Sequence, residues 1–254
     1  MRIFKFGGAS VKDANGVKNL FRVLQHEGVE NTLVVVSAMG KMTNAFEKIV
    51  HAYLYDQKYL QLTLSGVENY HLEIINDLFE EKHPMFQEHI RLFGRLQGFL
   101  LNNTSKDYNY VYDQIVPYGE LISTKIISHF LNSNRTQNEW LDARTIIKTD
   151  SSYRNAKVDW KATQLNCEQL NQQKLYVTQG FISKDKNNNT TTLGREGSDF
   201  TAGIFAYCLD AESVTIWKDV AGVLNADPRV FDKTTLLEQI SYQEAIEMAF
   251  YGAS

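Results

Sequence analysis

The stretch KFGGAS at residues 5–10 ends the first predicted strand and opens the first predicted helix. Residues 2–6 alternate weakly between apolar and polar side chains, as a half-buried strand does, and a glycine pair then interrupts the run. Ser10 followed by Asp13 resembles a capping box, and an apolar helical face comes after it. The segment therefore predicts a strand, a tight turn and a helix. The apolar face consists of Val17, Leu20, Phe21 and Leu24.

The glycine pair suggests an anion site at this turn. Gly7 and Gly8 lack a Cβ atom, so backbone N–H groups at the start of the helix can approach a phosphate closely. Lys5 at the end of the strand can add a mobile positive charge. An ordinary strand–turn–helix explains a glycine pair equally well. The spacing of a Walker A loop is absent.

Beyond this segment, short β-rich runs alternate with helical patterns, which predicts an α/β fold with a mainly parallel sheet covered by helices. Residues 33–37 form a continuous apolar, β-branched run, which is typical of a strand buried on both faces. Further strands are expected at 176–182 and 213–217, and a polar turn rich in Asn and Thr, suited to a hairpin tip, at 184–192. Helices are expected over 43–99 with an interruption at Pro84, from Gly119 as an amphipathic helix, from Asp199 and over 242–253.

Size and composition favour a globular protein that binds a small molecule. The chain has 254 residues, of which 43% are hydrophobic, and its net charge of −4 provides no basic field for nucleic acid or anionic lipid. The two cysteines, Cys167 and Cys208, have no metal-ligand spacing, and Cys208 is expected to be a buried thiol. Residues 33–38 are too short an apolar run to span a membrane, and no secretory signal opens the chain. We expect a cytoplasmic protein.

Two polar, glycine-containing segments lie next to predicted strands. In TTLGREGSD at 191–199, Arg195 can present its guanidinium to a carboxylate, although Ser198 and Asp199 can also be plain helix caps. The segment WKDVAGVLNADPR at 217–229 follows a strand, at the edge of an open α/β sheet where ligands bind, or it is a solvated loop. The dispersed histidines form neither a catalytic triad nor a zinc site.

In order and spacing, these segments closely resemble aspartate kinase, a member of the amino acid kinase superfamily. The resemblance implies a three-layer αβα sandwich around a mainly parallel sheet, with residues 1–254 forming the catalytic domain. It places the amino acid site in the N-terminal part and the nucleotide site in the C-terminal part. The segments that carry it are KFGGAS (5–10), VVVSAMGKMTN (34–44), GELIS (119–123), TQGFI (178–182), TTLGREGSDFTA (191–202), WKDVAGVLNADPR (217–229) and ISYQEAIEMAFYGAS (240–254).

The resemblance also implies roles for individual residues. Lys5 would stabilise charge on the transferring phosphoryl group, and Asp199 would orient Lys5. Arg195 would hold the α-carboxylate of aspartate, and Glu120 would hold its α-ammonium group, although Glu120 can also simply favour the helix dipole. Ser37, Thr43 and Ser198 would add hydrogen bonds to the substrate, and Gly7, Gly8, Lys218, Asp219, Leu224 and Arg229 would contact the nucleotide together with Lys5.

The reaction implied is transfer of the ATP γ-phosphoryl group to the β-carboxylate of L-aspartate, giving 4-phospho-L-aspartate. This is the first step of lysine, threonine and methionine biosynthesis. The acceptor carboxylate is already ionised at neutral pH, so no general base is needed, and transfer is expected to be direct, without a phosphoenzyme. Mg²⁺ would be held mainly by the nucleotide and water.

Some positions depart from the family pattern. Ala9 stands where a threonine is usual, Leu224 where many members have a tyrosine, and Ser254 where a lysine is usual, so contacts with ATP are expected to differ. The family's C-terminal ACT domains, which help to form dimers, are absent from these residues. We expect the native protein to continue beyond residue 254 and to form a homodimer or a higher oligomer. The alternatives are a kinase for glutamate or N-acetylglutamate, a silent binding regulator and, least favoured, a structural protein.

Overall fold

Five short strands form a parallel sheet at the centre of the first part of the chain. The computed structural model describes residues 1–194, 196–218, 220 and 222–252, and two compact units divide it, Met1–Trp217 and Lys218–Ser254. All strand pairs in the five-stranded sheet are parallel, in the order β3-β5-β2-β1-β8. The strands are β1 (Arg2–Phe6), β2 (Thr32–Val36), β3 (Glu139–Leu141), β5 (Leu175–Gln179) and β8 (Ser213–Trp217).

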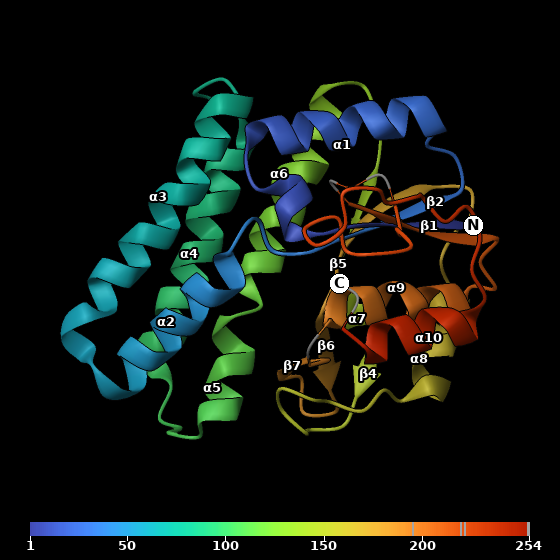
Figure 1. Ribbon diagram of the computed structural model, residues 1–254. Helices are drawn as coiled ribbons and strands as arrows, with labels where there is room; N and C mark the ends of the chain where they lie inside the picture. The colour runs from blue at the N-terminus through green and yellow to red at the C-terminus, as the bar shows by residue number, and fades with distance from the viewer. Residues whose placement is uncertain (195, 219, 221, 253–254) are drawn as a thin grey trace. The chain divides into compact units, whose positions relative to one another are not determined.

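Side-chain alternation along the central strands creates two cores, one on each face of the sheet. Phe4 and Phe6 of β1 pack in one cluster with α1 (Ala14–Glu27) and α6 (Tyr118–Ser133). Ile3 packs on the opposite face with α9 (Gly197–Cys208). Figure 1 shows α1 on one side of β1 and β2, and α7, α8 and α9 on the other. The predicted αβα sandwich with a mainly parallel sheet is confirmed.

The predicted helical region forms a helical layer beside the sheet (Figure 1). Pro84 is the first residue of α4 and begins that helix, because proline tolerates the first turn, where no N–H partner is needed. The elements in this region are α2 (Met42–Tyr55), η2 (Gln57–Tyr59), α3 (Leu60–Leu78), α4 (Pro84–Asn102) and α5 (Tyr108–Ile115).

A small second sheet contains the predicted polar turn. β6 (Ile182–Asp185) and β7 (Thr190–Thr192) form an antiparallel hairpin, and β4 (Lys148–Thr149) pairs with β6 in parallel. The turn between β6 and β7 is held by Asp185, whose carboxylate accepts hydrogen bonds from two backbone N–H groups, those of Asn187 and Asn189. This unit also contains the short α-helices α7 (Ala143–Ile146) and α8 (Trp160–Cys167).

Several local predictions are wrong, among them the single strand expected at 176–182, which is divided between β5 and β6 of different sheets. Residues Gly8–Val11 form the 3₁₀ helix η1, and α1 is capped by Asp13, which accepts a hydrogen bond from Gly16 N at 2.8 Å, rather than by Ser10. The predicted amphipathic helix α6 is buried on nearly every side because it lies between the sheet and the helical layer. Glu196, with a left-handed φ of 55°, immediately precedes α9. Ser198 and Asp199 therefore lie within the first turn of this helix and do not cap it.

The second unit, Lys218–Ser254, contains α10 (Tyr242–Phe250). A true capping box begins this helix, in which Ser241 and Glu244 satisfy each other's backbone N–H groups. The helix ends at Phe250, earlier than predicted, and residues 253–254 lie outside the described residues. In the described part of the whole chain, no helix is both long and apolar enough to cross a membrane. The assignment of residues 1–254 to one catalytic domain stays a prediction.

Candidate active site

A cavity of about 350 Å³ lies within the first unit, where Lys5 of β1 and the segment that follows β2 meet the start of α9. The parallel register brings the last residues of these strands, Phe6 and Val36, side by side, so their following loops share one edge of the sheet. Six side chains predicted from the sequence line the cavity, namely Lys5, Ser37, Thr43, Glu120, Ser198 and Asp199. The other described lining residues are Tyr112, Arg154, Phe181, Thr192, Gly194, Glu196 and Gly197.

Lys5 and Asp199 form an ion pair at this cavity. The two side chains lie on β1 and in the first turn of α9, and Lys5 Nζ is 2.8 Å from Asp199 Oδ1. The strand alternation explains the meeting, because Lys5 is two residues from Ile3 and so projects from the face that α9 covers. Only 9% of the Lys5 side chain is exposed, compared with 36% for Asp199. The pair therefore holds the ammonium group at a fixed place on the cavity wall.

The loops after β1 and β2 are in direct backbone contact. A Cβ atom on Gly8 would lie 2.6 Å from Ala38 O and 2.8 Å from Gly40 O, so only glycine fits there. Gly40 N donates a hydrogen bond to Gly8 O at 2.9 Å. A Cβ atom on Gly7 would meet only Lys5 Nζ, at the ordinary contact distance of 3.5 Å. The protein itself thus requires glycine at one of these two positions.

Glu120 is a buried carboxylate with an incomplete set of partners. It lies in the first turn of α6 and is 2% exposed. Its Oε1 accepts a hydrogen bond from Ala38 N at 3.2 Å, and in the described part of the protein Oε2 has no hydrogen-bond partner. Burial raises the pKa of Glu120 to about 8, although the hydrogen bond from Ala38 opposes this shift. A cationic ligand in the cavity would satisfy this side chain.

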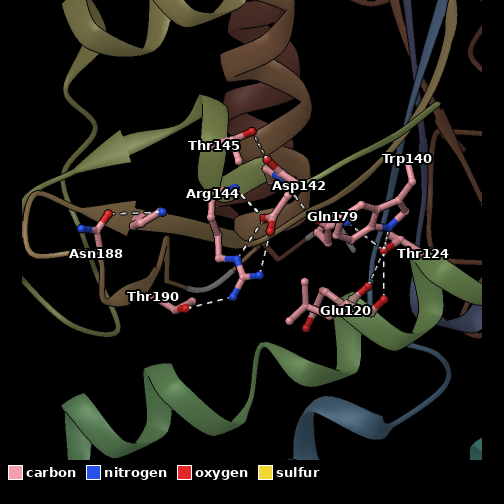
Figure 2. A network of polar contacts seen from close by, with 12 residues as sticks. Glu120, Thr124, Trp140, Asp142, Arg144, Thr145, Gln179, Asn188 and Thr190 are labelled. Atoms are coloured by element: carbon pink, nitrogen blue, oxygen red, sulfur yellow. Dashed lines mark hydrogen bonds and ion pairs between the residues drawn. The ribbon is translucent and has the colours of Figure 1, made fainter. Parts of the chain in front are cut away.

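A polar network, shown in Figure 2, fixes the first turn of α6 from behind. Thr124 Oγ1 donates to Glu120 O at 2.8 Å and accepts hydrogen bonds from Gln179 Nε2 at 2.8 Å and Trp140 Nε1 at 3.0 Å. Gln179 Oε1 in turn accepts from Ala143 N at 2.9 Å. The network ties α6 to the ends of β3 and β5, so it holds the backbone of Glu120 in place relative to the sheet.

The start of α9 packs closely on the turn after β5. A Cβ atom on Gly180 would lie 2.5 Å from the Ser198 side chain, and one on Gly197 would lie 2.6 Å from Phe181 Cδ2. Phe181 N donates to Thr201 Oγ1 at 2.8 Å. These contacts set Ser198 and the neighbouring Asp199 at the cavity.

Two residues of the cavity wall, Arg154 and Tyr112, are not among those predicted from the sequence. Arg154 belongs to the segment between β4 and α8, and its guanidinium carbon lies 4.5 Å from the ring centroid of Tyr112. Asp113, which is fully buried, accepts a hydrogen bond from Arg154 N at 2.9 Å. Burial raises the pKa of Asp113 to about 6. Neither Arg154 nor Tyr112 belongs to a recognisable motif, so only the tertiary structure reveals them.

The predicted nucleotide residues are not all in the same unit. Gly7 and Gly8 belong to the first unit, next to Lys5, and Lys218, Leu224 and Arg229 belong to the second. Arg229 forms an ion pair with Asp227 at 2.7 Å, and the backbone of Leu224 forms an isolated antiparallel β-bridge with that of Leu236. The remaining predicted site residues, Arg195 and Asp219, and the position of Ser254 lie outside the described residues. Among those described, no group of three or more His, Cys, Asp and Glu side chains could hold a metal ion.

Comparisons with known proteins identify the family. The chain is 32% identical over 263 residues to a chloroplastic bifunctional aspartokinase/homoserine dehydrogenase 2 of Arabidopsis thaliana, covering 99% of this chain and 28% of that protein. It is 31% identical to the lysine-sensitive aspartokinase 3 of Escherichia coli, covering 99% of this chain and 56% of the relative.

Among solved structures, E. coli aspartokinase III with lysine and aspartate superposes with a TM-score of 0.88 at 30% identity, over 99% of this chain and 57% of that one. The same enzyme with aspartate and ADP gives a TM-score of 0.87, over 98% and 56%. The chain thus spans between about a quarter and somewhat more than half of these relatives. The family model described as "Amino acid kinase family" matches residues 1–254, and the chain belongs to this family.

Proposed function

We propose that this protein is an aspartate kinase, which transfers the γ-phosphoryl group of ATP to the β-carboxylate of L-aspartate. The observation that carries the proposal is the cavity in which the Lys5–Asp199 ion pair and the buried Glu120 meet. An acidic amino acid offers a carboxylate to the first and an ammonium group to the second. The relatives named aspartokinases, including one solved with aspartate and ADP, support this choice of substrate.

The chemistry requires two anions to approach each other. An oxygen of the β-carboxylate attacks the γ-phosphorus in line, the bond to the bridging oxygen breaks, and ADP leaves with that oxygen. Lys5 would offset the charge on the transferring phosphoryl group, and Asp199 would keep Lys5 in place. No proton has to be removed, because the attacking carboxylate is already ionised. Transfer is direct, and no phosphoenzyme forms.

The remaining contacts to the amino acid are also part of the proposal. Glu120 would hold the α-ammonium group, because its buried Oε2 lacks a partner in the described structure. Ser37, Thr43 and Ser198 would donate hydrogen bonds from the cavity wall. Arg195 would hold the α-carboxylate, as the family resemblance implies.

For the nucleotide we propose the backbone of Gly7 and Gly8 together with Lys5, and residues Lys218, Asp219, Leu224 and Arg229. Mg²⁺ would enter with ATP and take its ligands from phosphate oxygens and water. The described side chains offer no cluster that fits a separately held metal ion, so no step is assigned to a protein-bound metal.

The properties of the whole protein are proposals too. Because the relatives are longer than this chain, we propose ACT domains beyond residue 254, a homodimer or higher oligomer formed through them, and a cytoplasmic place in lysine, threonine and methionine biosynthesis. Analytical ultracentrifugation of the full-length protein tests the oligomer.

A hydroxylamine trap for acyl phosphates tests the reaction itself. The protein is incubated with ATP, Mg²⁺ and hydroxylamine, and with aspartate, glutamate or N-acetylglutamate in parallel. We expect hydroxamate with aspartate alone, since an extra methylene fits poorly in a cavity built for the shorter acid. Hydroxamate formed with another acid would mean that the protein is a kinase of the same family with that acid as its substrate. If a folded protein that still binds ATP gives no hydroxamate with any of the acids, this result would contradict the proposed kinase activity and favour a binding regulator.

A further inference from the structure

The segment between β4 and α8 places a cation on the cavity wall that no sequence motif marks. Arg154 lines the same cavity as Lys5 and Glu120. Its backbone has φ = 68°, in the left-handed region that an arginine rarely adopts. The surrounding structure must therefore hold it there.

Asp113 provides much of this hold. Its fully buried carboxylate accepts hydrogen bonds from Arg154 N at 2.9 Å, Thr192 N at 2.9 Å and Thr192 Oγ1 at 2.7 Å. One side chain of α5 thus fixes the backbone of Arg154 relative to β7. Since Thr192 also lines the cavity, Asp113 fixes the backbone of Arg154 beside the cavity wall, although Arg154 itself is exposed.

The guanidinium of Arg154 rests on aromatic rings and has few polar partners among the described residues. Its carbon lies 4.5 Å from the ring centroid of Tyr112 and 5.3 Å from that of Tyr108. Its one ion pair with a described residue is a long contact of 3.9 Å to Glu47, and 43% of the side chain is exposed. No hydrogen bond joins its side-chain N–H groups to another described residue. A guanidinium that rests on aromatic rings keeps its N–H donors available for a carboxylate.

The charges of the proposed substrate indicate what Arg154 meets. An acidic amino acid carries one ammonium group and two carboxylates. Glu120 suits the ammonium group, and Lys5, already paired with Asp199, suits the reacting carboxylate and the phosphoryl group. The non-reacting carboxylate can accept several hydrogen bonds, so it has room for donors besides the expected Arg195.

We propose that Arg154 binds the α-carboxylate of the substrate and so helps to select dicarboxylic amino acids, alongside the Arg195 expected for the same group. This inference rests on the proposed function. It adds a specificity-determining residue that the motifs of the chain do not contain.

A substrate analogue separates this role from a structural one. L-Aspartate α-amide keeps the β-carboxylate and the ammonium group but loses the α-carboxylate. Replacing Arg154 by glycine suits the positive φ, so the fold is expected to survive. We expect Arg154→Gly to raise the KM for aspartate about ten- to hundredfold, the range for a charged hydrogen bond, with little change in kcat or in the KM for ATP. With the α-amide, the parent and Arg154→Gly are expected to have similar kcat/KM.

Two further variants sharpen the result. Arg154→Lys keeps the charge but not the planar fork, so it is expected to recover part of the loss. Arg135→Gly is the matched control, because Arg135 is exposed, has φ = 60° and is not among the described residues that line the cavity. It is expected to leave every constant unchanged.

Several outcomes would overturn the inference. These are an unchanged KM for aspartate in Arg154→Gly, an equal loss with aspartate and with its α-amide, or the same loss in Arg135→Gly. The parent is assayed first. If it does not phosphorylate aspartate, the proposed function fails, and the role of Arg154 falls with it before any variant is compared.

Discussion

Two buried ionisable side chains of opposite sign face the cavity, and their surroundings differ. Lys5 has a countercharge 2.8 Å away at Asp199. Glu120 has a single hydrogen bond from Ala38 N, and its second oxygen has no partner in the described structure. The ion pair holds the Lys5 ammonium group in place, whereas burial raises the pKa of Glu120 and so disfavours its charged form until a cation binds. A bound amino acid would therefore be recognised partly through a change in the protonation of Glu120.

At the residue scale, Lys5→Met should abolish most of the turnover without unfolding the protein. Removing a positioned charge from a site of transferring charge costs about 10²- to 10³-fold in kcat. Asp199 is 36% exposed, so water can solvate it once Lys5 is gone. The measurement is kcat in the hydroxamate assay, with circular dichroism melting as the check on folding. A folded variant with near-parental kcat would remove Lys5 from the mechanism.

The raised pKa of Glu120, about 8, predicts the pH dependence of substrate capture. Below that pH the free protein carries a protonated Glu120, which must lose its proton to pair with an ammonium group. We expect kcat/KM for aspartate to rise about tenfold per pH unit up to about pH 8 and then to level off. The Glu120→Gln variant should have a lower kcat/KM for aspartate at every pH, and its kcat/KM should not rise with pH in this way. If the variant keeps the same rise, the titrating group lies elsewhere.

At the scale of elements, the two glycines at the junction of β1 and η1 are expected to have different roles. Gly8 is required by packing, whereas Gly7 is expected to leave room for a ligand. Gly8→Ala would place a Cβ atom 2.6 Å from Ala38 O, and this backbone clash should lower the free energy of unfolding by about 1 to 3 kcal/mol. Gly7→Ala meets only Lys5 Nζ at 3.5 Å and should leave the unfolding free energy nearly unchanged. Urea denaturation measures both.

The same pair tests the phosphate contact proposed for this turn. If a phosphate approaches the backbone at residue 7, Gly7→Ala should raise the KM for ATP although the protein is as stable as the parent. A parental KM for ATP would mean that the phosphate does not approach this backbone closely.

Elements with a strong local signal could be predicted from the sequence. The apolar β-branched run at 33–37 became β2 (Thr32–Val36), and the Asn- and Thr-rich stretch became the β6–β7 hairpin. The predicted cap of α1 is wrong because Ser10 and Asp13 both fit the pattern, and only the 3₁₀ turn at Gly8–Val11 decides between them. The burial of α6 depends on the helical layer packed against it, which no periodicity within α6 reveals.

At the scale of the whole molecule, the candidate site could be predicted where motifs mark it. Lys5, Glu120 and Asp199 stand in three segments far apart in sequence, and the fold brings all three to one cavity. Arg154 and Thr124 could not be found in this way, because a single arginine in a polar segment and a threonine within a helix look ordinary. Their importance arises from contacts across the fold, with Asp113 and Gln179 respectively.

Two buried histidines of the helical layer are expected to make the stability of the first unit depend on pH. His71 of α3 and His89 of α4 are buried, and burial lowers the pKa of each to about 4. Both rings lie near Phe93, a member of the same hydrophobic cluster as Phe4 and Phe6 of the central sheet. Disturbing this layer should therefore weaken the core on that face of the sheet as well as the helices themselves.

The sign of the effect follows from the direction of the pKa shift. A lowered pKa means that the folded state resists protonation, whereas the unfolded histidine takes up a proton near pH 6.5. The stabilising contribution is thus complete above about pH 6.5 and is lost as the pH falls toward 4. For His71 alone we expect a loss of about 2 kcal/mol in unfolding free energy between pH 6.5 and 4.5. In His71→Gln, which cannot be protonated, that part of the decline should be absent, and urea denaturation at several pH values measures it. His51→Gln, at an exposed position, should follow the parent curve. If His71→Gln also follows the parent curve, another group is responsible for the acid sensitivity of the fold.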